Sequence, residues 1–230
     1  MAEVLDALNQ IWMNLAGMSN TLLRMAKGSI VTLQLFGIVL VLSMPLGFLL
    51  MLAYSSKNWF VRKITGLYIL VMRGTPLILQ IFFVFFALPK MPGIGKYMIF
   101  GRFTACAVAF TLNYAAYFAE IFRGGLLAVD KGQYEAAKVL GLSRFHTFVK
   151  IIIPQMVRVS LPAISNEAII LVKDTALVTI IGVVDLMHET YTIVSRQANV
   201  LPFAIAALFY LVMSYVLTVL FRFLEKKFAF

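Results

Sequence analysis

The stretch Gln133–Ser143 reads QYEAAKVLGLS, and it forms a polar island between long apolar runs. Its pattern is Glu-Ala-Ala, three residues, Gly141, nine residues, and then Ile151-x-Ile153-Pro154. The runs on either side indicate only a membrane protein. The island is therefore the part of the sequence that can indicate which kind of partner the protein contacts.

The island is predicted to be two short helices. Lys131–Leu140 is rich in helix formers, and Gly141 follows where a C′ glycine would stand. Ser143 is a suitable N-cap for a second segment, Arg144–Ile153, which Pro154 is expected to end. An ordinary amphipathic loop lying on the membrane is the alternative interpretation.

Composition places the rest of the chain in a bilayer. The 230 residues are 62% hydrophobic and 13% charged, with a mean hydropathy of +0.93. Soluble domains carry about 25% charged residues. The predicted fold class is all-α and integral to the membrane, and a break is expected at Pro162. Five predicted spans run over about Ser29–Tyr54, Ile64–Leu88, Phe103–Phe122, Gln155–Asp185 and Leu201–Leu220.

The basic residues that give the chain its net charge of +10 lie mainly on one side of the predicted spans. Such an asymmetry indicates the orientation of the chain in a membrane and argues against nucleic-acid binding. Twelve basic residues follow spans one, three and five, and six lie on the other side. The twelve are Lys57, Arg62, Lys63, Arg123, Lys131, Lys138, Arg144, Lys150, Arg158, Arg222, Lys226 and Lys227; the six are Arg24, Lys27, Lys90, Lys96, Arg102 and Arg196. The segment that contains the polar island, about 123–154, and the C-terminus are therefore predicted to be cytoplasmic, and the N-terminus outside.

Residues 1–28 are predicted to form an extracytoplasmic segment preceding one membrane domain, 29–230. Apolar residues recur every three or four positions, which indicates an amphipathic helix on the outer surface or against a partner. They are Leu8, Ile11, Leu15, Met18 and Leu22. Cys106 is the only cysteine, so no intrachain disulfide or cysteine-based metal cluster is expected, and no histidine set suggests a metal site.

Ionisable residues inside the predicted spans are the candidate substrate site. Arg73 and Glu167 lie roughly 15 and 18 Å into their spans, near the bilayer midplane. Asp174 shares a helical face with Glu167. Thr75 as N-cap and Pro76 as first residue would start a new helix in the membrane, whose N-terminus could face an anion beside Arg73.

These residues suit an amino acid. Its carboxylate would lie near Arg73 and Thr75, and Glu167 would receive the α-ammonium or a cationic side chain. The alternative is that Arg73, Glu167, Lys173 and Asp174 pair with one another or with a second subunit. On the third span, Asn113, Tyr117 and Glu120 share a face, which either lines the pathway or hydrogen-bonds a neighbouring helix.

Taken together, these motifs closely resemble the membrane permease subunits of polar amino-acid ABC importers, of the histidine, arginine, lysine and glutamine type. The resemblance covers about Gly28–Phe230. It is carried by the island together with Arg73–Leu77 (RGTPL), Tyr117–Leu126 (YFAEIFRGGL), Ile153–Gln155, Leu161-Pro162, Asn166-Glu167 and Leu171–Thr175 (LVKDT).

The resemblance implies a type I importer permease in a bacterial cytoplasmic membrane, with the island as a coupling helix on a separate ATPase. Glu135 would contact the ATPase, Ala136 and Ala137 would allow close approach, and Gly141 would permit the bend. The implied partners are an ATPase dimer using ATP and Mg²⁺, a second permease subunit, alike or different, and an extracytoplasmic amino-acid-binding protein.

No phosphate-binding Gly-rich loop ending in Gly-Lys-Ser/Thr occurs in the chain, so we expect no enzymatic activity and no cofactor in this polypeptide. A transporter or channel working without an ATPase and a non-transporting scaffold or sensor are the alternatives, as is an importer of another solute class. The two acidic residues Glu167 and Asp174 favour a cationic amino acid, but the sequence does not identify the substrate.

Overall fold

The computed structural model describes the backbone of residues 2–228 and the side chains of residues 17–228. Over that backbone it contains helices and turns without a strand, which confirms the predicted all-α class. The α-helices are α1 (Ala2–Tyr54), α2 (Trp59–Gly74), α3 (Leu77–Phe82), α4 (Arg102–Ala128), α5 (Gly132–Val139), α6 (Arg144–Thr147), α7 (Ile153–Asp174), α8 (Leu186–Gln197) and α9 (Leu201–Phe228). Short π and 3₁₀ segments are η1 (Phe83–Ala87), η2 (Leu88–Lys90), η3 (Gly95–Tyr97), η4 (Phe148–Ile152) and η5 (Thr175–Ile181).

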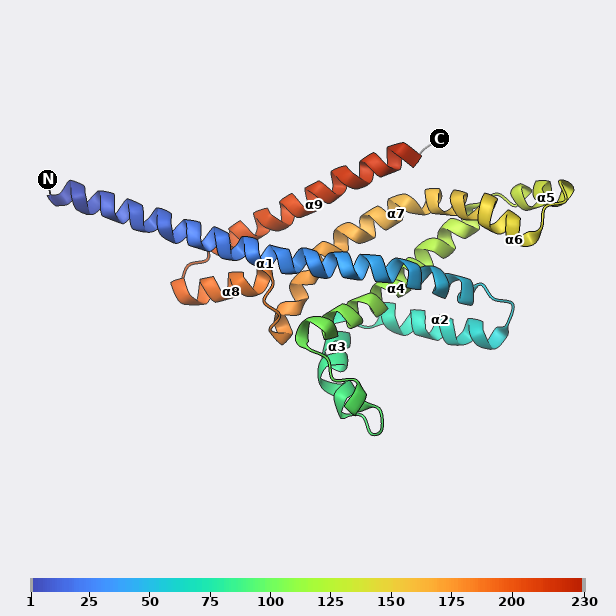
Figure 1. The fold of residues 1–230 in the computed structure, drawn as a ribbon, viewed down its shortest axis with the longest axis horizontal. Helices are drawn as coiled ribbons and strands as arrows, with labels where there is room; N and C mark the ends of the chain where they lie inside the picture. The colour runs from blue at the N-terminus through green and yellow to red at the C-terminus, as the bar shows by residue number, and fades with distance from the viewer. Residues whose placement is uncertain (1, 229–230) are drawn as a thin grey trace.

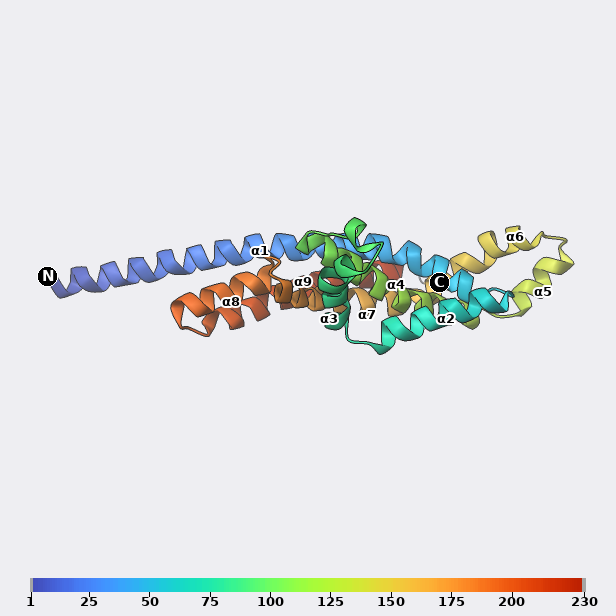
Figure 2. The same cartoon turned by 90° about the horizontal axis from the view of Figure 1, so that it is seen from below.

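The helices form an elongated bundle (Figures 1 and 2). The N-terminal part of α1 and α8 lie at one end of the long axis, and α5 and α6 lie at the other (Figure 1). The segment from α3 to η3 projects sideways near the middle. This arrangement separates the polar island from the rest of the molecule and leaves it accessible.

Helix α4 is the centre of the bundle. About 72% of its most apolar window is buried, and Phe110, Tyr114 and Phe118 are among the largest buried side chains. Glycines allow its neighbours to approach closely. A Cβ atom on Gly47 of α1 would lie 2.6 Å from the Cβ of Phe118, and one on Gly125 would lie 2.8 Å from the Met156 carbonyl oxygen of α7.

By length and composition, three described helical stretches could each cross a membrane: Gly17–Tyr54, Arg102–Ala128 and Leu201–Phe228. Helices α2 and α3, with the turns that follow, form a bent pair that could make a fourth span. Helix α7 falls outside this set, although its 22 residues are about 33 Å long. It carries the polar residues of the fourth predicted span.

The break expected at Pro162 is wrong, because α7 continues through Pro162 to Asp174. The fourth predicted span extended to Asp185, but the α-helix ends at Asp174 and the 3₁₀ segment η5 follows it.

At the N-terminus, α1 runs without interruption through residue 28. The side chains of Leu8, Ile11 and Leu15 lie outside the described residues, whereas Met18 and Leu22 are exposed. The outer-surface position of residues 1–28 stays a prediction.

Candidate functional site

A cleft of about 560 Å³ lies where the α2–α3 junction faces α4 and α7. It is lined by Arg73, Gly74, Thr75, Pro76, Leu77, Asn113, Tyr114, Tyr117, Glu167, Ile170 and Asp174. The five residues predicted for substrate binding, Arg73, Thr75, Tyr117, Glu167 and Asp174, are all in this set. Three separate helical segments thus bring them to one surface.

The α2–α3 junction forms one wall of the cleft. Here α2 ends at Gly74, α3 begins at Leu77, and the helical direction changes by 108°. The new helix within the span was predicted, but its start is one residue later than expected. Pro76 is the N-cap and Thr75 is the C-cap of α2, in extended conformation with φ −116° and ψ 146°. A proline disfavours helical geometry in the residue before it, which explains why Thr75 leaves the helix.

Two side-chain amides satisfy carbonyl groups that the break leaves free. Gln80 Nε2 donates to the Met72 carbonyl oxygen at 2.9 Å and to Thr75 Oγ1 at 2.8 Å. From α4, Asn113 Nδ2 donates to the same Met72 oxygen at 2.8 Å and to Gln80 Oε1 at 3.1 Å. Such donors satisfy backbone acceptors that have lost their partners within the helix. Asn113 therefore hydrogen-bonds a neighbouring helix, as one of the two interpretations expected, and it also lines the cleft; its place on a transport pathway stays a prediction.

The positive group of the cleft is Arg73. Its Cζ atom lies 5.2 Å from the centre of the Tyr117 ring, within cation–π range. The side chain is exposed in the single chain. Because α3 has only six residues, its dipole is small, and the charge of Arg73 dominates this wall.

The acidic groups of the cleft are on α7. Glu167 and Asp174 are both half-buried, and Asp174 Oδ2 accepts a hydrogen bond from the Tyr114 hydroxyl at 2.8 Å. Among residues 17–228, the ion pairs within 4.0 Å are Arg24–Glu189 and Arg123–Glu120. None of Arg73, Glu167, Lys173 and Asp174 forms such a close ion pair with another of the four, and Asp174 accepts from Tyr114 instead. Pairing with a second subunit stays open.

Glu120 belongs to a different environment from its predicted partners on α4. Its Oε2 accepts from Arg123 at 2.7 Å, and Arg123 lies over the Tyr54 ring. Tyr114, by contrast, was not predicted as a site residue. It lies three residues before Tyr117 on the same helix, and this helical spacing was the signal that could have identified it.

The polar island folds as two short helices, as predicted, with α5 ending in a Schellman motif. Leu142 N donates to the Ala137 carbonyl oxygen at 3.0 Å and Gly141 N to that of Lys138 at 3.1 Å, while Gly141 has φ +71°. Ser143 caps α6 by accepting from His146 N at 3.2 Å. The expectation that Pro154 ends this segment is wrong. Proline is tolerated in a first turn, and the chain passes through η4 into α7 with Pro154 there.

The predicted coupling residues have different exposures. Glu135, Ala136 and Gly141 are exposed, whereas Ala137 is only 2% exposed and faces its own chain. Large apolar side chains, Val139, Leu140 and Phe145, are exposed around them. Partial burial raises the pKa of the Tyr134 phenol in α5. This end of the molecule thus presents a mixed apolar and charged surface suited to a protein partner.

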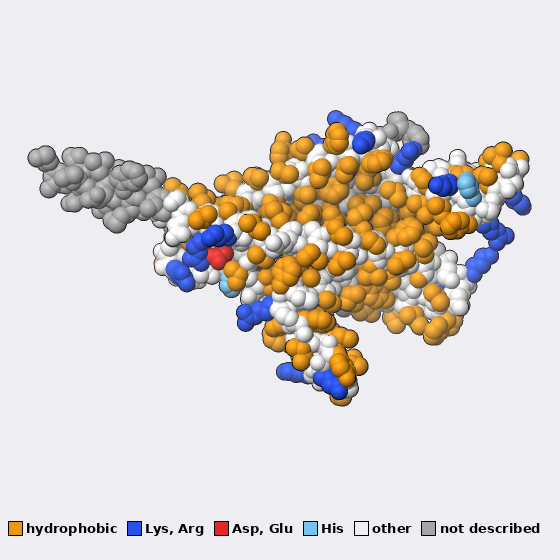
Figure 3. Space-filling view, in the orientation of Figure 1, with side chains coloured by type: hydrophobic (Ala, Val, Ile, Leu, Met, Phe, Trp, Pro, Cys, Tyr) orange, Lys and Arg blue, Asp and Glu red, His pale blue; other side chains and the backbone are white. Residues whose placement is uncertain are grey.

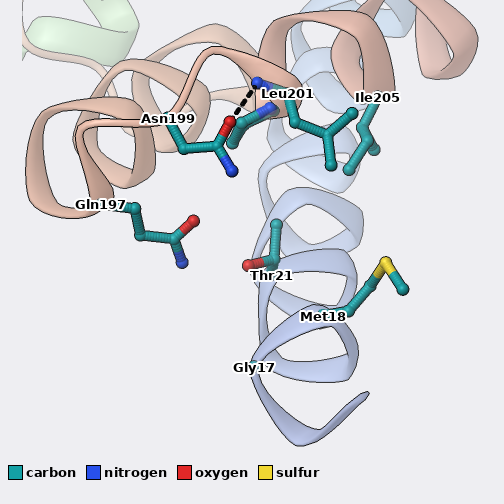
Figure 4. Close-up of a pocket in the computed structure, with 8 residues that line it drawn as sticks. Gly17, Met18, Thr21, Gln197, Asn199, Leu201 and Ile205 are labelled. Atoms are coloured by element: carbon teal, nitrogen blue, oxygen red, sulfur yellow. Dashed lines mark hydrogen bonds between the residues drawn. The ribbon is translucent and has the colours of Figure 1, made fainter. Parts of the chain in front are cut away.

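Another cavity, of about 350 Å³, lies between α1, α8 and α9 (Figure 4). It is lined by Gly17, Met18, Thr21, Gln197, Asn199, Leu201, Pro202 and Ile205, so it contains no ionisable side chain. Asn199 Oδ1 is already used by Leu201 N at 2.9 Å. The cleft with Arg73 and Glu167 is the better candidate site. The described residues contain no group of three or more His, Cys, Asp or Glu that could hold a metal ion, and Cys106 is buried.

The chain is similar to known transport proteins along most of its length. Residues 43–230 match the family described as binding-protein-dependent transport system inner membrane component. A putative glutamine transport system permease protein GlnP of Rickettsia bellii is 34% identical, over 91% of this chain and 94% of that protein. The arginine transport system permease protein ArtQ of Bacillus subtilis is 38% identical, over 87% and 90%.

Solved structures agree with the sequence relatives. A crystal structure of an amino acid ABC transporter with histidines has a TM-score of 0.83 and 33% identity, covering 91% of this chain and 96% of that one. The MetNI methionine ABC transporter in an inward-facing conformation has a TM-score of 0.69 at 17% identity, which shows the shared fold. This chain belongs to the family of inner membrane components of binding-protein-dependent transport systems, and it is a multi-pass permease subunit of an ABC importer.

Proposed function

We propose that this permease imports a polar amino acid and that the cleft at the α2–α3 junction binds it. The observation that carries the proposal is the placement of opposite charges around one cavity. Arg73 lies on the α2 wall, and Glu167 and Asp174 lie on α7. An amino acid carries a carboxylate and an ammonium group, so this distribution complements both ends. Relatives named for glutamine and arginine support the substrate class.

A cationic side chain is favoured within this class. Two carboxylates face the cleft against one guanidinium, and one carboxylate can hold the α-ammonium while the other remains for a second cation. Asp174, held by Tyr114, is the more fixed of the two. A neutral substrate such as glutamine would leave the second carboxylate without a charged partner.

ATP hydrolysis takes place in a separate subunit in this family, so the present chain must receive mechanical work through contact. In our proposal, ATP and Mg²⁺ bind the partner ATPase, and its dimer closes around the nucleotide. Glu135, Ala136 and the bend at Gly141 then transmit this motion from α5 and α6 to α7, which carries Glu167. Family membership decides against a transporter without an ATPase and against a non-transporting scaffold.

The proposed topology puts α5, α6 and the C-terminus in the cytoplasm. The binding protein then delivers its amino acid at the opposite end, where α8 and the start of α1 lie (Figure 1). A second permease subunit, alike or different, would cover the open side of the cleft where Arg73 is exposed.

The experiment is substrate-stimulated ATPase activity of the reconstituted complex, measured with its binding protein across the twenty amino acids. We expect stimulation by cationic amino acids, and loss of stimulation in Glu167→Gln with normal assembly. Glu120→Gln is the matched control, because it makes the same change on α4 outside the cleft. Normal stimulation of Glu167→Gln would contradict the proposed site, and no stimulation by any of the twenty amino acids would contradict the substrate class.

A further inference from the structure

The carboxyl group of Asp185 is buried where α8 packs against α1 and α9, outside the substrate cleft. Asp185 is 0% exposed and is the N-cap of α8. Its Oδ1 atom accepts a hydrogen bond of 2.9 Å from His188 N, whereas Oδ2 is buried and has no hydrogen-bond partner among the described residues. Capping of α8 therefore accounts for only one of the two carboxyl oxygens.

No cation neutralises this carboxyl group within residues 17–228, where Asp185 takes part in no ion pair within 4.0 Å. Arg24, on the α1 side of the interface with α8, is paired with Glu189. Arg102 of α4 lies against Gly182, where an added Cβ would be 3.5 Å from its Nη1 atom. Acidic groups on the surface are placed differently, because on the face shown in Figure 3 those at the α8 end lie beside Lys and Arg side chains. A carboxyl group buried without a cation favours its neutral, protonated form.

The titratable groups that face Asp185 come from three helices. They are Cys106 of α4, Tyr210 of α9 and His188 of α8 itself. Helix α1 contributes the hydroxyl of Thr32, and η5 contains no ionisable residue. The hydroxyl of Tyr210 is also buried without a hydrogen bond. His188 is the one group of this set that can gain a positive charge, so an experiment has to separate its titration from that of Asp185.

Close packing around Asp185 restricts what can bind its free oxygen. A Cβ atom on Gly28 of α1 would lie 2.8 Å from the Asp185 carbonyl oxygen. The same three helices are joined by a small apolar cluster of Met25, Leu186, Ile193 and Ala206. A buried water molecule needs space and two to four polar partners, whereas a proton needs no space.

We propose that Asp185 is a proton-binding residue that controls how firmly α8 is held against α1 and α9. With a proton on Oδ2 the carboxyl group is neutral and suits the packed interior, and the Tyr210 hydroxyl is available as its acceptor. After loss of the proton the carboxylate requires water, which reaches it when α8 moves away. The packed state thus binds a proton that the opened state releases, so the attachment of α8 weakens as the pH rises. This proposal does not depend on the amino-acid site, and either can fail without the other.

The test is amide hydrogen exchange of α8 in the reconstituted complex at about pH 5 and about pH 8. Asp185→Asn keeps a capping side chain but cannot ionise. Compared with wild type at the same pH, it should exchange its α8 amides several-fold more slowly at about pH 8 and equally at about pH 5. Asp130→Asn is the matched control and should behave as wild type, because Asp130 also accepts a backbone N–H, from Gly132, but is exposed.

Equal exchange of wild type and Asp185→Asn at about pH 8 would overturn the proposal and leave Asp185 as a helix cap only. The difference should persist when both proteins also carry His188→Gln. Its disappearance there would assign the titration to the imidazole and overturn the proposal as well. Slower α8 exchange of wild type in sodium chloride than in choline chloride at one pH would likewise overturn it, since a metal ion would then occupy the site.

A second neutral cap, Asp185→Ser, gives the same comparison if the asparagine variant does not assemble. Infrared spectra of wild type alone add an independent readout, because a protonated carboxyl group has a carbonyl band that a carboxylate lacks. This band should weaken between about pH 5 and about pH 8, and its absence at the lower pH would overturn the proposal.

Discussion

The hydroxyl of Tyr114 on α4 donates a hydrogen bond of 2.8 Å to Asp174 Oδ2 on α7. Tyr114 is buried in the centre of the bundle, so its ring cannot move far, and it holds the carboxylate at the cleft. The central helix thereby positions a charged group that belongs to another helix. A carboxylate held in this way loses little conformational entropy when a ligand binds.

Replacing Tyr114 by Phe should raise the KM for the transported amino acid severalfold while lowering stability by about 1.5–3 kcal/mol, the usual contribution of a hydrogen bond to a charged group. Tyr68→Phe is the control, because it removes a 2.7 Å bond to the Leu112 carbonyl oxygen away from the cleft. Thermal unfolding and substrate-stimulated ATPase kinetics measure the two effects. If both variants change KM equally, Tyr114 does not position Asp174 for binding.

The bend between α2 and α3 should depend on the amide of Asn113. Asn113→Leu removes one of the two donors to the Met72 carbonyl oxygen, which keeps the donor from Gln80, and it leaves Gln80 Oε1 without its partner. A polar group left in this way costs about 1–3 kcal/mol when it is buried. We expect a lower unfolding temperature and weaker substrate binding, since Arg73 adjoins the same junction. Asn113→Asp keeps the shape of the side chain but loses the donor to both Met72 and Gln80, so retained stability in that variant would argue against the role of the donor.

Close packing of α1 on α4 should make Gly47 intolerant of a side chain. A Cβ there would lie 2.6 Å from Phe118 Cβ and 2.9 Å from the Ala115 carbonyl oxygen, so Gly47→Ala should destabilise the protein by about 1–3 kcal/mol. Gly37→Ala on the same helix meets nothing within 4 Å and should be neutral or slightly stabilising. Detergent-solubilised thermal unfolding distinguishes them, and similar behaviour of the two variants would contradict the packing argument.

The bend in the polar island should require Gly141 for its backbone conformation. Its φ of +71° costs a residue with a Cβ about 1–2 kcal/mol, although nothing would contact the Cβ itself. Gly141→Ala should therefore weaken copurification with the ATPase, and Gly141→Asn should restore much of it, because asparagine tolerates this region. A Gly141→Ala complex as stable as wild type would show that the bend is dispensable for docking.

The polar island was largely predictable, because its structure depends on neighbours in sequence. Ser143 as a cap and Gly141 as a C′ residue act within one turn of the helix they delimit. The prolines were predicted less well. Pro76 did produce a break, but Pro154 and Pro162 did not, since a first turn tolerates proline and surrounding helices can support an interior one.

The sequence by itself determined that this is a helical membrane protein with a polar island between its spans, and the resemblance of its motifs indicated the permease family. Hydropathy, charge placement and short-range motifs act locally and can be read without coordinates. Only the tertiary structure decided that Arg73, Tyr117, Glu167 and Asp174 line one cleft, and that Glu120 pairs with Arg123 instead. The reason is that helical spacing shows which residues share one face of a helix but not which neighbour that face contacts. The neighbour depends on how α1, α4 and α7 pack, which close approach at Gly47 and Gly125 allows.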